Sequence, residues 1–341
     1  MHRHILDIDA AAEADRIVAW LREGMHQLHR MGAVLGISGG IDSSVCLALC
    51  VRAFGAERVV PLLLPEKDSD PASEDLARML VAHYGVTPLL EVITPALDGC
   101  ACYQRRDEAI ARVFPEYDAR AGYKAKIVLP PRLLDQGTLN VFSLAIITPA
   151  GEEKRARLRP ADLAQIVAAS NFKQRTRAAM LYYHAERLNY AVVGTPNKNE
   201  HDQGFFVKYG DGGADLMPIV HLYKTQVYQL ARHLGVPEVI QKRPPTSDTY
   251  SAPTTQEEFF FRLPFEILDL LWFAQEQGVS VAETAAALGM EPDQVRRAFD
   301  DFAQKQRSTE YLRTPPLDMA SLGAPIFATA DSGLAALKGP P

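Results

Sequence analysis

The stretch from Ala33 to Ser44 constrains the fold of this chain more than any other part of the sequence. It begins with the apolar run AVLGI, typical of a buried β-strand, continues through the turn SGG, and enters an apolar helix. Glycines at positions 39 and 40 let a ligand approach the backbone, and the N–H groups at the start of a helix attract an anion. The stretch therefore predicts a strand, a phosphate-binding loop and a helix N-terminus.

Three polar side chains complete this loop. Ser38 and Ser43 offer hydroxyl donors. Asp42 is the unexpected member, because a carboxylate repels a phosphate unless a cation such as Mg²⁺ lies between them. We therefore expect Asp42 to be a metal ligand; the alternative is a tight turn in which Asp42 caps the helix. The order S-G-G-x-D-S resembles the loop of the N-type ATP pyrophosphatases, which adenylate a substrate and release pyrophosphate.

The rest of the N-terminal half alternates helical and strand patterns. Apolar spacing predicts a first helix over 11–30, then strands over 33–37, 58–65 and 89–93 with helices over 44–54 and 73–84 between them. This alternation predicts an α/β fold, a doubly wound parallel sheet with helices on both faces. Ligands bind beyond the carboxyl ends of the strands in such sheets, and the phosphate loop lies at one of these ends.

Residues of about 120–165 interrupt this pattern. A β-rich run over 139–148, a turn at 149–152 and a polar run over 154–158 predict a β-hairpin inserted in the sheet domain. The polar run carries Lys154, Arg155 and Arg157. Their charges either guard a solvated edge strand or contact phosphates.

The next helix and strand carry candidate ligands. A helix expected over 172–188 begins with Lys173, Arg175 and Arg177. Because cations oppose the dipole at a helix N-terminus, we expect an anionic ligand beside them. The strand 190–194 then ends at Thr195, and Glu200 follows in the same loop.

Residues 204–215 combine aromatic side chains with Lys208, Asp211 and several glycines. This mixture suits a planar, charged small molecule. A glycine-rich connector with a buried aromatic plug is the alternative.

The C-terminal third is expected to be helical around one long loop. Helices are predicted over 222–234 and over 265–276, and Lys224 lies in the first turn of the former. Residues 241–256, between the two helices, are expected to be mobile. Residues 279–303 resemble a helix-turn-helix, but acidic side chains on the second helix repel DNA, so we expect packing against the core. We expect one domain over 1–322 and a flexible tail over 323–341.

Composition narrows the functional classes. A net charge of −6 and a pI near 5.9 argue against broad contact with nucleic acid or a membrane surface. No signal-peptide pattern and no run of about 18 apolar residues is present. The spacing of the cysteines fits neither zinc-binding pairs nor a disulfide framework, which favours the cytoplasm: they are Cys46, Cys50, Cys100 and Cys102.

Four segments together resemble the ammonia-dependent NAD synthetases: the phosphate loop, NFKQRTR at 171–177, GTPNKNE at 194–200 and FFVKYGDGGADLMP at 205–218. The resemblance implies an adenine nucleotide alpha hydrolase-like fold. It also implies ATP-binding positions at Gly36, Ile37, Ser38, Gly39, Gly40, Ile41, Asp42, Ser43, Thr195, Lys224 and Thr246. In the same way it implies that Asp42 and Glu200 hold Mg²⁺ and act with Lys224 in catalysis, and that Arg175, Lys208 and Asp211 face nicotinic acid adenine dinucleotide.

The implied reaction activates the substrate carboxylate as an acyl-adenylate, which ammonia converts to the amide, giving NAD, AMP and pyrophosphate. The family forms homodimers, so we expect a homodimer. About 30 residues precede the loop, fewer than a domain needs, so we expect ammonia from solution or from a separate glutaminase.

Two segments depart from the family pattern. The run TQEEFFF at 255–261 replaces an Asp-Glu and Leu-Gly pattern, and Glu310 and Tyr311 stand in place of a His-Lys pair. Since a pyrophosphate needs cations, we expect the hairpin cations to replace the lost charge. A related amide ligase acting on another carboxylic acid is the alternative, and a non-catalytic nucleotide-binding regulatory protein is the second.

Overall fold

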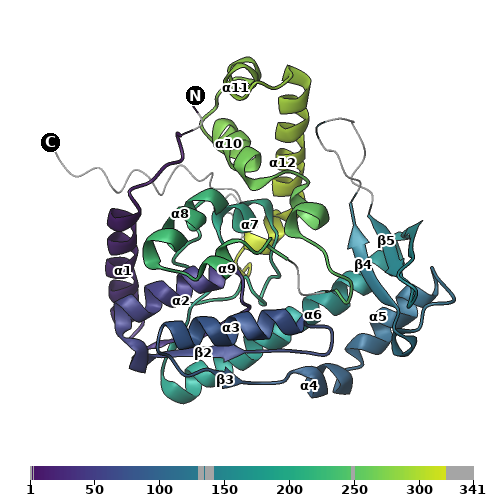
Figure 1. Cartoon of the computed structure of the whole chain (residues 1–341), viewed down its shortest axis with the longest axis horizontal. Coiled ribbons are helices and arrows are strands. Elements are labelled where there is room, and N and C mark those ends of the chain that lie inside the picture. Colours follow the sequence, from purple (N-terminus) through teal and green to yellow (C-terminus); the bar gives the residue numbers. More distant parts are fainter. Residues whose placement is uncertain (1, 3, 130–133, 135–141, 247–249, 320–341) are drawn as a thin grey trace.

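In the computed structural model (Figure 1), which is described over residues 2, 4–129, 134, 142–246 and 250–319, a four-stranded parallel sheet has the order β3-β2-β1-β7. The strands are β1 (Ala33–Gly36), β2 (Val59–Leu63), β3 (Leu89–Leu90) and β7 (Ala191–Val192). Ala33 pairs with Val59 on one side and with Ala191 on the other, so β1 lies inside the sheet. All four strands lie within the predicted ranges.

Helices cover both faces of this sheet. Ala33 and Leu35 point into a core shared with α1 (Ala10–Gln27), α2 (Ile41–Phe54), α3 (Pro71–His83) and α8 (Lys224–Leu234). Val34 points to the opposite face, where α4 (Thr94–Gly99), α5 (Cys102–Ala111) and α6 (Pro160–Leu188) pack. Successive side chains of a strand point to opposite faces, so one apolar run serves both cores. The predicted doubly wound α/β fold is confirmed.

The helix expected over 172–188 begins earlier, at Pro160. Proline suits the first helical position, because its fixed φ matches the helix and its missing N–H is not needed there. Lys173 and Arg175 therefore lie in the middle of α6. The helix-dipole argument for an anion at this point therefore does not hold, because the positive end of the helix is elsewhere.

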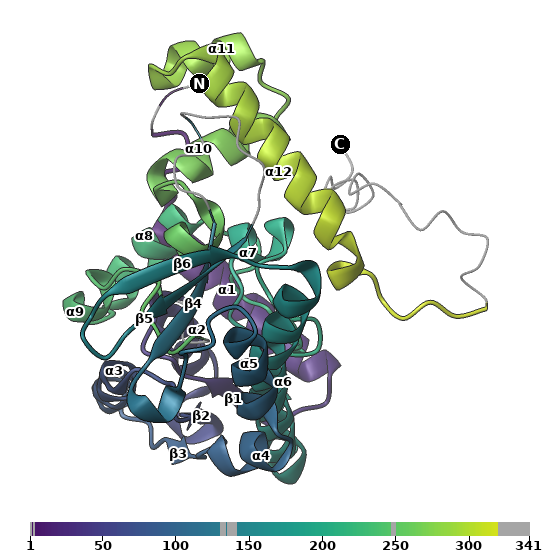
Figure 2. The ribbon, with the colours of Figure 1, turned by 90° about the vertical axis from the view of Figure 1, so that its right-hand side faces the viewer.

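The inserted segment forms a three-stranded antiparallel sheet rather than a hairpin (Figure 2). Its strands are β4 (Lys124–Val128), β5 (Ser143–Ile147) and β6 (Glu153–Arg157). The predicted hairpin matches β5 and β6, although residues 139–141 lie outside the described part of the chain. The strand β4, which was not predicted, binds the segment at 251–252. Ala252 N donates to Ala125 O at 3.2 Å, and Ala125 N donates to Ser251 Oγ at 2.9 Å.

The helices α10 (Phe265–Glu276), α11 (Val281–Leu288) and α12 (Pro292–Arg313) form their own apolar core and lie together beyond α7 (Lys198–Gln203) and α8 (Figures 1 and 2). Leu268, Val295 and Phe302 are buried in this core with Leu6 from the N-terminus. The helix-turn-helix-like segment therefore packs into a core, as expected, but this core is shared with α10 and is separate from the cores on the two faces of the parallel sheet. Shorter elements are α9 (Glu238–Gln241), a π-helical turn (Glu257–Phe261), and 3-10 turns at Ala56–Arg58 and Ala119–Ala121.

The tail expected over 323–341 lies outside the described residues. Among the helices described, none combines the length and the apolar character needed to cross a membrane.

Candidate active site

A cavity of about 720 Å³ opens at the carboxyl ends of the parallel strands. This is the edge at which α/β sheets bind ligands. Most of the expected ATP-binding residues line it, namely Gly36, Ile37, Ser38, Gly40, Ile41, Asp42, Ser43, Thr195 and Thr246. Gly39 belongs to the same loop, and Lys224 contacts Asp42. The structure therefore brings the predicted nucleotide site together.

Gly39 permits the sharp turn of the phosphate loop. Its φ of +73° lies in the left-handed region, and a Cβ at this position would lie 2.6 Å from the carbonyl oxygen of Ser73. A residue with a side chain would clash there. Ser43 Oγ donates to Gly40 O at 3.1 Å and lies 3.2 Å from Ser38 Oγ, so the hydroxyls brace the loop. The first N–H groups of α2 have no partner within the helix and suit a phosphate.

Both carboxylate oxygens of Asp42, in the first turn of α2, are bound by side chains from other elements. Oδ2 accepts a hydrogen bond from Lys224 Nζ at 2.5 Å, and Oδ1 accepts one from Asn197 Nδ2 at 2.9 Å. Lys224 begins α8 and is fully buried. The N-cap of α2 is Gly40. Helix capping therefore does not explain Asp42.

Glu200, in α7, is the second acid of the site. Its Oε2 accepts from the backbone N of Asn197 at 3.1 Å, which closes a capping box, and its Oε1 accepts from Gln256 Nε2 at 3.0 Å. Burial, and after it the Asp42 carboxylate, raises the pKa of Glu200 to about 8. Burial works against the charge of Lys224, yet Asp42 and Glu200 raise its pKa above the usual value. The ammonium group of Lys224 thus pairs directly with Asp42, and its charge also acts on Glu200.

This donor set fits Mg²⁺. Proteins hold this ion through one or two carboxylates, with substrate phosphates and water completing the shell. Asp42 and Glu200 both line the cavity beside the phosphate loop. Burial is the main cause of the raised pKa of Glu200, and a divalent cation would offset the second cause, repulsion from Asp42. Within the described ranges, no group of three or more His, Cys, Asp or Glu side chains is arranged to hold a metal ion.

The three expected substrate residues are placed differently from one another. Asp211 lines the cavity, accepts from Val207 N at 2.7 Å, and has its pKa raised to about 6 by burial. Arg175 and Lys208 lie outside the lining and contact each other, because Arg175 Nε donates to Lys208 O at 3.1 Å. Lys208 Nζ donates to the carbonyl oxygens of Tyr311 and Thr314 at the end of α12. Lys208 therefore caps a helix in this structure.

Two arginines of the cavity were not assigned to the site from the sequence. Arg177 Nε donates to Leu64 O at 3.2 Å, and Arg243 Nη2 donates to Ser73 Oγ at 2.8 Å. Arg177 stood among the cations of α6 that were singled out. Arg243 follows α9 in a loop, and only the tertiary fold brings it to the cavity, so no local sequence pattern indicates its position.

One side of the cavity is aromatic. Phe205 packs on Phe260 with ring centroids 4.9 Å apart, and Phe259 packs on Tyr250 at 5.3 Å and on Phe142 at 6.4 Å. We call these five residues the aromatic wall; all of them line the cavity. The wall suits a planar ring, and Phe205 is its one member from the run 204–215. Phe142, next to β5, shows that the inserted sheet contributes to the site.

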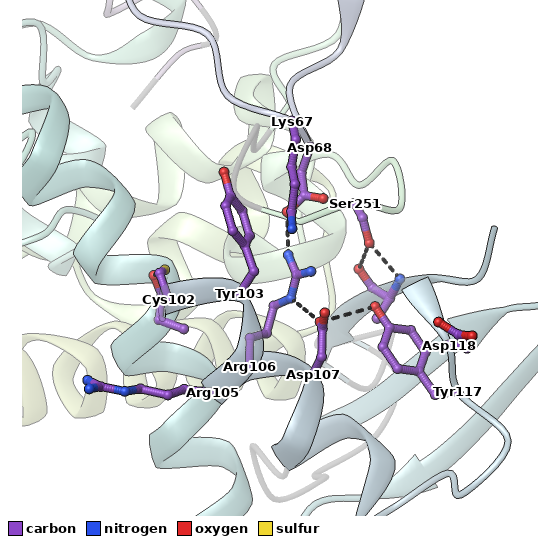
Figure 3. Close-up of polar contacts among 12 residues, drawn as sticks. Lys67, Asp68, Cys102, Tyr103, Arg105, Arg106, Asp107, Tyr117, Asp118 and Ser251 are labelled. Atoms are coloured by element: carbon purple, nitrogen blue, oxygen red, sulfur yellow. Dashed lines mark hydrogen bonds and ion pairs between the residues drawn. The ribbon is translucent and has the colours of Figure 1, made fainter. Parts of the chain in front are cut away.

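Lys173 belongs to a buried ion-pair network behind the cavity rather than to a ligand site. Its Nζ donates to Glu66 Oε1 at 2.9 Å and to Asp68 Oδ2 at 2.7 Å, and the residue is fully buried. Arg106 of α5 lies between Asp68 and Asp107 and donates to both (Figure 3). The network holds the loop that follows β2. The expected anionic partner of Lys173 is thus supplied by the protein itself.

The cations of β6 lie outside the cavity lining. Lys154 pairs with Glu116 at 3.2 Å, and Arg155 pairs with Glu153 at 2.5 Å. These contacts fit the alternative of a charged, solvated edge strand. The expectation that hairpin cations replace the charge lost at Glu310 and Tyr311 has no support in this geometry.

A parallel α/β sheet with a Ser/Gly phosphate loop and a Lys–carboxylate group at its carboxyl edge defines an ATP-binding protein of the adenine nucleotide alpha hydrolase-like class. The model of the NAD synthase family matches residues 13–113 and 140–316. The chain belongs to this family.

Named relatives agree with this assignment. The chain is 51% identical to the NH(3)-dependent NAD(+) synthetase of Rhizobium meliloti (strain 1021), over 91% of this chain and 92% of that protein. It is 48% identical to the protein of the same name from Mesorhizobium japonicum, over 94% and 99%. The solved NH3-dependent NAD synthetase from Campylobacter jejuni shares the fold, with a TM-score of 0.60 and 21% identity over 92% of this chain and 100% of that chain.

Proposed function

We propose that this chain makes NAD by activating the carboxylate of nicotinic acid adenine dinucleotide with ATP and amidating it with ammonia. The observation that carries the proposal is the contact of Asp42 with Lys224, beside Glu200 and the phosphate loop, in a cavity that also has an aromatic wall. The names of the relatives support the same activity.

The residues of this chain divide the work of binding ATP. The phosphate loop and the first turn of α2 bind phosphate oxygens, and Arg177 and Arg243 add positive charge to the cavity. Asp42 and Glu200 would hold Mg²⁺. When bound, this ion offsets phosphate charge and makes pyrophosphate a better leaving group.

The chemistry then has two steps. A carboxylate oxygen of the dinucleotide attacks the α-phosphorus of ATP, and the bond from that phosphorus to pyrophosphate breaks. The nitrogen of ammonia attacks the acyl carbon, loses a proton, and AMP leaves with the electron pair of the broken C–O bond. Because water would hydrolyse the adenylate, the aromatic wall serves the reaction by excluding water from the cavity.

Three further features are part of the proposal. The enzyme acts as a homodimer, it works in the cytoplasm, and its ammonia comes from solution or from a separate glutaminase. Four cysteines without a disulfide, three of them buried, are compatible with a reducing compartment.

The test is a reaction of the purified protein with Mg²⁺, ATP, ammonium and nicotinic acid adenine dinucleotide, followed by mass spectrometry. We expect NAD, AMP and pyrophosphate in equal amounts. The Asp42→Asn variant, which keeps the size of the side chain, serves as the matched control. Stoichiometric ADP would contradict adenylation, and AMP formed only with a different carboxylic acid would favour another amide ligase.

A further inference from the structure

A buried carboxylate outside the cavity joins α7, which carries Glu200, to α8, which carries Lys224. Asp269 belongs to α10 in the C-terminal helical layer and is fully buried. Its Oδ1 accepts a hydrogen bond from Asn199 Nδ2 of α7 at 2.5 Å, and its Oδ2 accepts one from the backbone N of Thr225 in α8 at 2.7 Å. Asp269 does not line the cavity.

The two partners of Asp269 are each adjacent in sequence to a residue of the site. Asn199 precedes Glu200, and Thr225 follows Lys224. Asn199 also binds the residue that precedes Thr225, since Lys224 N donates to Asn199 Oδ1 at 3.4 Å. The Asp269 carboxylate, the Asn199 amide and the backbone N–H groups of Lys224 and Thr225 thus form a closed ring of contacts. This ring sets the distance between α7 and the start of α8.

The second contact of α10 with these helices is weaker. Glu276 pairs with Lys198 of α7 at 2.7 Å and accepts from the hydroxyl of Tyr223, but its side chain is 27% exposed. This pair is only partly buried, so water competes for both partners and weakens it. The hydrogen bonds of Asp269, in contrast, are fully buried and shielded from water.

We infer that Asp269 is a positioning residue for the reaction, and that it holds Glu200 and Lys224 at the spacing that nucleotide binding and adenylation need. Burying a carboxylate is unfavourable, and an apolar side chain of similar volume would often stabilise a protein as well or better. The presence of an acid at position 269 is explained if its two hydrogen bonds fix the positions of Glu200 and Lys224, which act together. Its charge also lies at the positive end of α8.

Donor and acceptor matching makes the inference testable. In Asp269→Asn, one end of the new amide carries donors, which face either Asn199 Nδ2 or Thr225 N. Rotation of the Asn199 amide only moves the mismatch to Lys224 N. In the double variant Asn199→Asp/Asp269→Asn, every donor again meets an acceptor and the total charge is unchanged.

The inference rests on the proposed function, so the experiment has two readouts. We would measure kcat and KM in NAD synthesis, and the affinity for ATP in the presence of Mg²⁺ by titration calorimetry. In Asp269→Asn, kcat and Mg²⁺-dependent ATP affinity should each fall about tenfold or more, because a buried donor is left unpaired, while KM for the dinucleotide stays within about twofold. The double variant should recover both to within about threefold of the parent.

Asp162 offers the matched control. It is a buried carboxylate that also accepts two hydrogen bonds, from Arg112 and Arg159, both at 2.7 Å, but it touches neither α7 nor α8. Asp162→Asn should lower the melting temperature and leave kcat unchanged. If Asp269→Asn fails to fold, Asn199→Ala cuts the link to α7 and keeps the bond to Thr225, so the same losses are expected.

The outcomes separate the two ideas. A parent protein that makes no NAD contradicts the proposed function, while the calorimetry still tests Asp269. Unchanged ATP affinity in folded Asp269→Asn or Asn199→Ala overturns the positioning role. Recovery of the melting temperature without recovery of ATP affinity in the double variant overturns it as well.

Discussion

The ammonium nitrogen of Lys224 lies 2.5 Å from Oδ2 of Asp42, although 182 positions separate the two residues in the sequence. Lys224 begins α8, and Asp42 lies in the first turn of α2. The contact places a buried positive charge between the phosphate loop and the acid of α7. Together with the bond from Asn197 to Asp42, it ties α2 to elements of the C-terminal half of the chain.

Both acids beside Lys224 should be needed for adenylation. Asp42→Asn and Glu200→Gln each remove a charged oxygen ligand without changing size, so we expect turnover to fall more than about 100-fold while the fold stays intact. Pyrophosphate release at varied Mg²⁺ measures the loss, and circular dichroism checks the fold. Turnover near that of the parent at limiting Mg²⁺ would show that the metal assignment is wrong.

Lys208 should be more important for the dinucleotide than for ATP. In Lys208→Met we expect KM for the dinucleotide to rise about tenfold, through loss of a charge-assisted contact, and KM for ATP to stay within about twofold. Lys242→Met, at an exposed lysine paired with Glu238, is the control. Because Lys208 caps α12 in this structure, a lower melting temperature with both KM values unchanged would assign it a structural role alone.

The ion-pair network around Asp68 should make stability depend on pH. Burial acts to raise the pKa of Asp68, but Lys173 and Arg106 outweigh it and hold the pKa below the usual 3.8. A carboxyl group with a lowered pKa stabilises the fold fully above its unfolded value, and this stability is lost as the pH falls through the folded pKa.

Asp68→Asn should therefore lower the free energy of unfolding at pH 7 by about 1.5–3 kcal/mol, the value of hydrogen bonds to a charged group. The difference from the parent should shrink below about pH 4, because the unfolded parent then binds a proton that the folded parent takes up only at lower pH. Urea unfolding between pH 7 and pH 3 measures both. A difference that stays constant down to pH 3 would contradict the role of the Asp68 charge.

Local patterns were sufficient to predict the sheet. The strand at 33–36 and the helix after it follow from one apolar run and one Ser/Gly turn, both of which act over short range. The start of α6 was missed although Pro160 is a local signal for a first helical position. β4 was missed because its run, KAKIV, is short and is paired by a strand that follows a long interval.

The site was predictable only where one residue type implies one chemistry. Asp42 beside a phosphate loop is such a case, and so is Lys224 once the family resemblance is known. Lys173 appeared equivalent to Arg177, but Glu66 and Asp68, more than a hundred positions away, neutralise it. Asn197, Gln256 and Arg243 gain their contacts only through tertiary packing, so sequence patterns did not indicate them.

The inserted sheet should act on the substrate through apolar contact rather than charge. Phe142 and Ile127 line the cavity, whereas the cations of β6 do not. Lys154 and Arg155 are exposed and paired with Glu116 and Glu153, and pairs of this kind contribute little.

We therefore expect the triple variant Lys154→Gln/Arg155→Gln/Arg157→Gln to keep KM for the dinucleotide within about twofold of the parent, because no cation of the cavity is changed. Phe142→Ala should instead raise KM for the ligand that stacks on the aromatic wall by about three- to tenfold, since it removes a ring contact worth about 0.5–1.5 kcal/mol. Steady-state kinetics with each substrate in turn identifies that ligand. A tenfold rise of KM in the triple variant, with Phe142→Ala unchanged, would reverse this division and restore charge as the contribution of the inserted sheet.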